Sequence, residues 1–113
     1  MIQEVEITQS YKRLAEALRN AQEVTEHAIK TKAAVSALVA EATFDGRIDG
    51  KNEVARDAQA RRLFADDYKN LDDAESWVRQ VRHWVELQRL EVDAVRARLR
   101  LAEVLANAQA AAE

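Results

Sequence analysis

Apolar side chains recur at alternating steps of three and four residues along most of the chain, which is the spacing of a helix that buries one face. The pattern predicts one helix over about residues 7–42 and another over about residues 71–110. The first stripe consists of Ile7, Tyr11, Leu14, Leu18, Ala21, Thr25, Ala28, Lys32, Val35, Val39 and Ala42. The last helix has an inner stripe of Leu71, Ala74, Val78, Val81, Val85, Gln88, Val92, Val95, Leu99, Ala102 and Ala106.

The helical pattern stops at residues 43–52, where both glycines of the chain stand next to aspartates. Gly46 and Gly50 predict a loop whose backbone adopts positive φ, and Ile48 is expected to anchor that loop on the helices. Asn52 is a favoured N-cap residue, so the loop is expected to lead into a short helix.

That short helix is predicted over about residues 53–65. A second break is predicted at residues 66–70, just before the last helix. Asn70 and Asp73 stand three residues apart there and resemble a capping box, with aspartate in place of the usual glutamate.

The last helix carries a second apolar stripe, which lies roughly 160° around the helix from the inner stripe. One partner helix cannot bury two nearly opposite faces, so the second stripe predicts self-association. The predicted fold is all-α: a long antiparallel helical hairpin with a short connecting helix, assembling into a four-helix bundle dimer or a larger helical oligomer. In the alternative monomer, the stripe stays exposed or the short helix covers it. The predicted interface residues are Trp84, Leu87, Leu90, Ala94, Ala97, Leu101 and Val104.

Composition narrows the class of protein further. The 113 residues suit a single helical domain, 1–113, with 48% apolar and 33% charged residues, no proline and no cysteine. A turn-rich β-fold is disfavoured, and two glycines cannot build the common phosphate-binding loops. The absence of cysteine excludes disulfides, thiol nucleophiles and cysteine-ligated zinc.

The charge is nearly balanced, with a formal net charge of −3. This balance gives no overall attraction to nucleic acid or anionic lipid. No apolar run has the length of a signal peptide core or of a membrane span of about 20 residues, so a cytoplasmic protein without membrane contact is expected.

The residue types of common catalytic and metal sites do not occur in productive patterns. The segment from Asp45 to Arg56 resembles a calcium-binding EF-hand loop, but arginines occupy its third and twelfth positions. His27 and His83 each lack a second histidine one turn away. Acidic pairs such as Asp66 and Asp67 stand at predicted helix starts, where they favour the helix dipole. No catalytic, cofactor or metal residues are therefore predicted.

Basic residues are the candidate contacts for a partner protein or for nucleic acid. Four arginines share one side of the last helix, and others surround the central loop. Asp93 and Glu103 interleave with the helical arginines, and Arg89 with Asp93 is expected to form an i,i+4 ion pair. A solvated, salt-bridged face is therefore favoured over nucleic-acid binding. The candidate contacts are Arg47, Lys51, Arg56, Arg82, Arg89, Arg96 and Arg100.

The central segment also carries a resemblance. Ile48, Gly50, Lys51, Asn52 and Arg56 form an I-x-G-K-N-x-x-x-R pattern between two long helices, which resembles small helical proteins of phages and prophages. The resemblance implies a phage or prophage source and a role for these residues in the turn or in contact with a partner. In the simpler interpretation, Asn52 caps the short helix and Arg56 pairs with Asp49 or Asp45.

These observations predict a non-enzymatic protein of phage or prophage type. Its expected activity is protein–protein contact, both with itself and with an unidentified protein partner. The alternative is a nucleic-acid-binding accessory factor in phage replication or recombination that uses the arginine-rich faces.

Overall fold

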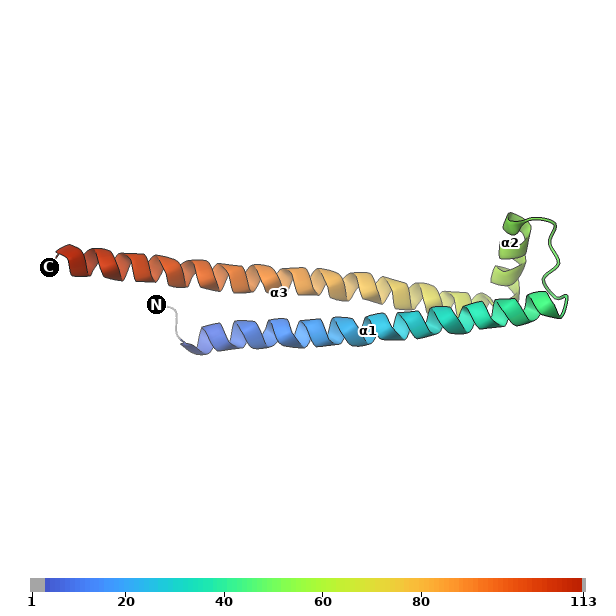
Figure 1. The fold of residues 1–113 in the computed structure, drawn as a ribbon, viewed down its shortest axis with the longest axis horizontal. Coiled ribbons are helices and arrows are strands. Elements are labelled where there is room, and N and C mark those ends of the chain that lie inside the picture. Colours follow the sequence, from blue (N-terminus) through green and yellow to red (C-terminus); the bar gives the residue numbers. More distant parts are fainter. Residues whose placement is uncertain (1–3, 113) are drawn as a thin grey trace. The chain divides into compact units, whose positions relative to one another are not determined.

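The computed structural model describes residues 4–112, which form three helices: α1 (Glu4–Phe44), α2 (Glu53–Leu63) and α3 (Ala65–Ala112) (Figure 1). No strand occurs in this range, so the prediction of an all-α fold with two long helices is confirmed. Residues 1–3 and 113 of the predicted domain lie outside the described range. None of the helices within residues 4–112 carries an apolar stretch long enough to cross a membrane.

The predicted break at residues 66–70 is wrong, because α3 already begins at Ala65. Phe64 alone separates α2 from α3, and its φ of −118° and ψ of 44° turn the chain sharply. Phe64 belongs to the hydrogen-bonded turns on both sides: its N–H donates to the Ala60 carbonyl, and the Tyr68 N–H donates to its carbonyl, both at 2.9 Å. The break is therefore a kink of one residue.

The acidic residues after the kink explain why a helix forms where a loop was expected. Asp66 and Asp67 lie in the first turn of α3, where carboxylates interact favourably with the free N–H groups and the helix dipole. Asn70 lies inside the helix as a result, so the predicted capping box of Asn70 and Asp73 is wrong.

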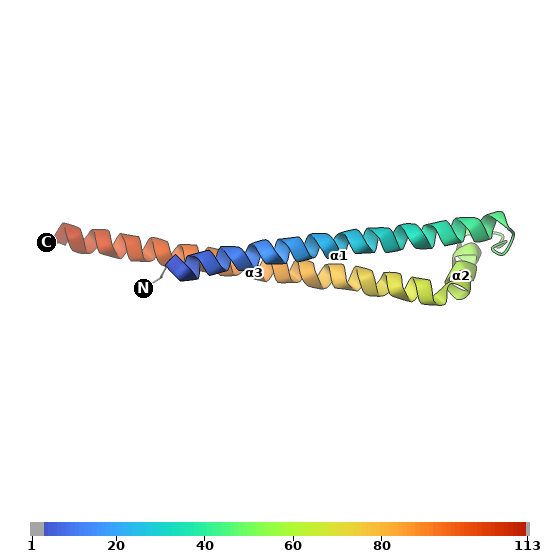
Figure 2. The same ribbon diagram turned by 90° about the horizontal axis from the view of Figure 1, so that it is seen from below.

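The chain packs as two compact units, which are described separately. The terminal unit comprises Met1–Ala21 and Gln80–Glu113, and the turn unit comprises Gln22–Arg79. Segments of α1 and α3 lie side by side in each unit, and α2 belongs to the turn unit (Figures 1 and 2).

The core of the terminal unit joins valines of α3 to small residues of α1. The predicted inner stripe is confirmed from Val81 to Ala102 and is wrong at Ala106, which is exposed. Its buried members in this unit are Val81, Val85, Gln88, Val92 and Val95, and Leu99 and Ala102 are half-buried. The α1 side contributes two buried small residues, which let the two helix backbones approach closely. These residues are Ser10 and Ala17.

The predicted stripe of α1 is wrong at Tyr11, Leu18 and Lys32, which are exposed. Tyr11 and Leu18 keep 46% and 43% of their surface. The preceding residues, Ser10 and Ala17, are buried in their place because the close approach of α3 leaves room for small side chains only. The Ser10 hydroxyl donates to the Ile7 carbonyl at 2.9 Å, so its burial leaves no unpaired O–H. The observed stripe of buried and half-buried positions is Ile7, Ser10, Leu14, Ala17, Ala21, Val24, Ala28, Thr31, Val35, Leu38 and Ala42, with Thr25 and Val39 half-buried beside it.

The turn unit has a small buried cluster of Ala42, Ile48 and Ala60. Val39, Phe64 and Tyr68 pack against this cluster from α1, the kink and α3. The prediction that Ile48 anchors the loop is therefore confirmed. Figure 2 shows α2 lying across the region where α1 ends and α3 begins.

The end of α1 is a Schellman motif around Gly46. Gly46 adopts a φ of 84°, as predicted, and its N–H donates to the Thr43 carbonyl at 3.3 Å. The Arg47 N–H reaches back to the Ala42 carbonyl at 2.9 Å. These bonds satisfy carbonyls that a helix end otherwise leaves free and direct the chain towards Ile48.

Candidate functional site

The first candidate site is the outer face of α3 in the terminal unit, which we define as the seven predicted interface residues. All seven are exposed. Leu87, Leu90 and Leu101 keep 42%, 63% and 59% of their surface. The structure therefore brings these residues together on one side of one helix. The complete set is Trp84, Leu87, Leu90, Ala94, Ala97, Leu101 and Val104.

Helix geometry places the outer face away from the core. Val85, Val92 and Val95 point to α1, and residues two positions after a core residue project to the far side at 100° per residue. In both views α1 is the helix that lies beside this part of α3 (Figures 1 and 2). The apolar outer face is thus left uncovered by the described residues of the terminal unit.

Sequence reasoning missed Leu105, which is 55% exposed and lies at the edge of the outer face. It stands three heptads after Trp84 and therefore on the same edge of the helix. The heptad spacing from Trp84 was the signal in the sequence that could have predicted Leu105.

Charged residues flank the outer face, with acidic residues towards the start of α3 and basic residues towards its end. Glu91 and Asp93 precede Arg98 and Arg100 along α3, and all four are exposed. None of these four forms an ion pair with another residue of the described range. Their charges are therefore available to a partner.

The arginine side of α3 differs from its prediction in one respect. Arg89 pairs with Glu86 at 3.4 Å, so the expected ion pair with Asp93 is wrong. The i,i+3 spacing of Glu86 brings its carboxylate within reach of Arg89 as well as the i,i+4 spacing of Asp93 does. Arg82, Arg96 and Arg100 are exposed, and no carboxylate of residues 4–112 pairs with them.

The basic residues of the central loop belong to the turn unit, apart from the outer face. Arg47 bonds both carboxylate oxygens of Asp45 through Nε at 3.0 Å, and its guanidinium lies 6.0 Å from the centre of the Phe64 ring. The hydrogen bond from Arg47 lowers the pKa of Asp45 and raises that of Arg47. Lys51 is exposed on the loop. The Arg47 side chain therefore contacts Asp45 and Phe64 within the turn unit.

Arg56 contacts the loop backbone and not a carboxylate. Its Nη1 donates to the Gly50 carbonyl at 3.1 Å, so the expected pairing with Asp49 or Asp45 is wrong. Asp45 already holds Arg47, and Asp49 accepts a bond from Gln59 at 2.8 Å. The simpler interpretation of Asn52 is confirmed, since its side chain accepts from the Ala55 N–H at 2.9 Å.

Gln59 is the organising residue that sequence reasoning missed. Its Oε1 accepts from the Gly50 N–H at 2.7 Å and from the Asp49 N–H at 3.1 Å, while its Nε2 donates to Asp49. These bonds join residues nine and ten positions apart, so no short sequence motif predicts them.

Gly50 is required for a different reason from the predicted one. Its φ is not positive, and a Cβ placed on it comes within 2.8 Å of the Arg56 backbone nitrogen and 2.9 Å of Ala55. The glycine therefore permits close approach of the loop to the first turn of α2.

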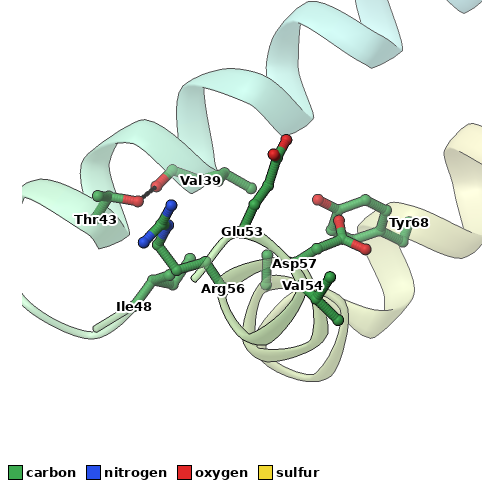
Figure 3. Close-up of a pocket in the computed structure, with 9 residues that line it drawn as sticks. Val39, Thr43, Ile48, Glu53, Val54, Arg56, Asp57 and Tyr68 are labelled. Atoms are coloured by element: carbon green, nitrogen blue, oxygen red, sulfur yellow. Dashed lines mark hydrogen bonds between the residues drawn. The ribbon is translucent and has the colours of Figure 1, made fainter. Parts of the chain in front are cut away.

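A groove of about 490 Å³ lies beside this loop in the turn unit. Figure 3 shows Glu53 and Arg56 reaching from α2 towards α1. Asp57 is held by Arg61 at 3.1 Å, and the Thr43 hydroxyl donates to the Val39 carbonyl. The lining includes no cysteine, serine or histidine.

The described residues also lack a metal-binding cluster. No group of three or more histidine, cysteine, aspartate or glutamate side chains within residues 4–112 is placed to hold an ion. His27 and His83 are exposed and belong to different units.

Comparison with known proteins finds no match of this chain to a protein-family model, to a curated protein or to a solved structure.

Proposed function

We propose that this protein is a non-enzymatic helical protein that acts through protein–protein contacts and associates with itself through the outer face of α3. One observation carries the proposal: the outer face is a continuous exposed apolar stripe on a helix whose opposite face is already buried. Contiguous apolar surface of this kind marks interaction sites on water-exposed proteins.

The free energy available from this face is sufficient to drive association. Full burial of a leucine side chain contributes about 1.5–3 kcal/mol. Leu87, Leu90 and Leu101 are roughly half exposed, so covering the three contributes roughly 2–5 kcal/mol before Trp84 and Val104 are counted.

The proposal includes a phage or prophage origin, a cytoplasmic location and a further protein partner. The origin is supported by the I-x-G-K-N-x-x-x-R pattern, in which Ile48, Gly50 and Asn52 each have a defined role in the turn. The exposed groove and the exposed Lys51 leave the turn unit open to such a partner.

The test replaces Leu87 and Leu101 together by glutamate. We expect the mass measured by light scattering to fall to that of one chain, because carboxylates on the outer face oppose its burial. The matched control is Phe44→Glu, which changes an apolar residue with 94% exposure in the turn unit and should leave the mass unchanged. Helix content is followed by circular dichroism in parallel. A wild-type chain that is monomeric over a wide range of concentration contradicts the proposal.

The second candidate function is nucleic-acid binding. It is favoured by the exposed guanidinium groups of Arg82, Arg96 and Arg100, which form no ion pair within residues 4–112. If they bind phosphates, replacing Arg96 and Arg100 by glutamine should flatten the slope of log affinity against log salt by about 1–2. We expect no measurable binding of DNA or RNA at physiological salt, because Asp93 and Glu103 interleave with the arginines and the net charge is −3. A tight, salt-sensitive complex of the wild type with either nucleic acid reverses the order of the two candidates.

A further inference from the structure

We propose that the outer face binds a second copy of this chain in antiparallel orientation, with the two-fold axis between Ala94 and Ala97. This inference rests on the self-association proposed above and adds its orientation and register. The order of side-chain sizes and of charges along α3 supports it.

The apolar residues of the outer face form complementary layers when two copies run antiparallel. In a two-fold interface, if residue i meets residue j, then j also meets i. Setting Ala94 against Ala97 of the second copy places Leu90 against Leu101 and Leu87 against Val104. Small residues then lie at the centre, where the helices are closest, and larger ones lie towards both ends.

The edges of the face match in the same register. Trp84 and Leu105 occupy one edge of the helix, and the antiparallel arrangement brings Trp84 of one copy to Leu105 of the other. Both side chains are more than half exposed in the single chain. Two further apolar contacts therefore extend the interface at its ends.

The charges decide between the two orientations. The flanks of the face are acidic at Glu91 and Asp93 and basic at Arg98 and Arg100, and these four residues form no ion pair within the described range. Antiparallel copies place Asp93 beside Arg100 and Glu91 beside Arg98, twice each by symmetry. A parallel pair keeps one favourable contact, Asp93 beside Arg98, but also places Glu86 beside Glu91 of the second copy, where like charges repel.

The position of the outer face also sets the order of the helices in the complex. Because it lies nearly opposite the face that packs on α1, the second copy attaches on the far side of α3. In the terminal units the order is then α1, α3, α3 of the second copy and α1 of the second copy, in a row and not as a closed four-helix bundle.

A charge exchange tests the orientation. Asp93→Arg sets arginine against Arg100 of the second copy at two symmetric sites, and we expect the dissociation constant to rise about tenfold. Adding Arg100→Asp to the same chain restores both pairs in the antiparallel arrangement and should return the constant to within about threefold of wild type. Glu16→Arg, an exposed change of equal charge on α1, is the control. Sedimentation equilibrium of the full chain gives the constants.

Each outcome has a defined meaning. Rescue by the exchange supports the antiparallel register, since in a parallel pair Asp93 faces Arg98 and Arg100→Asp cannot repair its loss. Weakening without rescue overturns the orientation and leaves self-association standing. A dimer insensitive to Asp93→Arg overturns this face as the interface. A monomeric wild type overturns the proposed function itself.

Cross-linking checks the register independently, because the chain contains no cysteine. Leu90→Cys and Leu101→Cys chains with tags of different size, mixed and oxidised, should yield the mixed disulfide. Two antiparallel copies of Leu90→Cys hold their thiols about 16 Å apart along the helix, beyond the reach of a disulfide. A predominance of disulfides between identical chains indicates a parallel pair and contradicts the proposal.

Discussion

The two units of this protein are held together by different means. The terminal unit is a pair of helix segments joined by a stripe of valines against Ser10 and Ala17, and one whole side of its α3 segment is apolar and exposed. The turn unit is closed by specific hydrogen bonds: Gln59 holds the loop backbone, Asn52 caps α2, and Gly46 ends α1.

The two units differ in whether their buried or loop polar groups have hydrogen-bond partners. In the turn unit, the Ala42 carbonyl of α1 accepts from the loop N–H groups of Arg47 and Ile48, and side chains of α2 bond the backbone of Asp49 and Gly50. In the terminal unit the buried Oε1 of Gln88 has no hydrogen-bond partner in the described range, and the apolar outer face has no cover. The loop of the turn unit is therefore fixed by hydrogen bonds from its own neighbours, whereas the α3 segment of the terminal unit keeps an exposed apolar face.

The largest expected loss of stability comes from truncating Ile48, which anchors the loop of the turn unit. Ile48→Ala removes most of a buried side chain from the cluster with Ala42 and Ala60 and should lower the free energy of unfolding by about 2–5 kcal/mol. Urea denaturation measures the loss, and amide exchange should rise first around the loop. Val54→Ala, at a residue with 80% exposure, is the control and should cost less than about 0.5 kcal/mol. Equal losses for the two variants contradict the role of Ile48.

The next effect separates the two glycines of the turn unit. Gly50→Ala forces a Cβ against the backbone of Ala55 and Arg56 and should cost about 1–3 kcal/mol in unfolding free energy. Gly46→Asn should cost less, because asparagine tolerates positive φ and nothing lies within 4 Å of a Cβ at Gly46. Thermal unfolding compares the variants. The explanation fails if Gly50→Ala is as stable as the wild type.

A smaller effect, of opposite sign, should be found in the terminal unit. Gln88→Met removes the unpaired buried amide oxygen and keeps the volume of the side chain, so the free energy of unfolding should rise by about 1 kcal/mol. Gln80→Met, at an exposed position, should change it by less than about 0.5 kcal/mol. Chemical denaturation of both variants decides the matter: a loss of stability in Gln88→Met shows that the amide has a favourable partner.

The smallest effect concerns the exposed ion pair of the turn unit. The hydrogen bond from Arg47 lowers the pKa of Asp45 below its ordinary value of 3.8. A carboxyl group with a lowered pKa stabilises the folded state above its ordinary pKa, and this contribution is lost as the pH falls through the lowered value. Arg47→Gln should raise the pKa of Asp45 towards 3.8 in a carboxyl NMR titration. Arg61→Gln is the control, and an unchanged Asp45 pKa in Arg47→Gln contradicts the assignment.

The apolar period predicted the buried stripe of α3 more accurately than the buried stripe of α1. The inner stripe of α3 was predictable because valine and alanine stand at its core positions and charged residues stand between them. On α1, Tyr11 and Ser10 both fit a helical stripe, and apolar size favours Tyr11. Ser10 is buried because α3 approaches closely at that point, which the α1 segment alone does not reveal.

The turn shows the same division on a shorter scale. Asn52 and Gly46 act on backbone groups within three or four residues, so residue type and position were enough to predict their roles. Gln59 and Gly50 act across the fold of the loop, through contacts that exist only once α2 has packed beside it. Asp66 and Asp67 favour the first turn of a helix, but only the structure shows that this turn follows directly on the kink at Phe64.

The amino-acid sequence by itself determined the helical class, the positions of the two long helices, the cap at Asn52 and the apolar outer face of α3. Each of these depends on the direction of side chains along a helix or on bonds between near neighbours, which local geometry sets. Only the tertiary structure decided that Ser10 and Ala17 of α1 are buried in place of Tyr11 and Leu18. It also decided that α3 begins at Ala65, that Arg56 bonds the Gly50 carbonyl, and that Gln59 holds the loop. These features depend on the distance between segments remote in the chain, because packing density and hydrogen-bond geometry then choose among side chains that local pattern leaves equivalent.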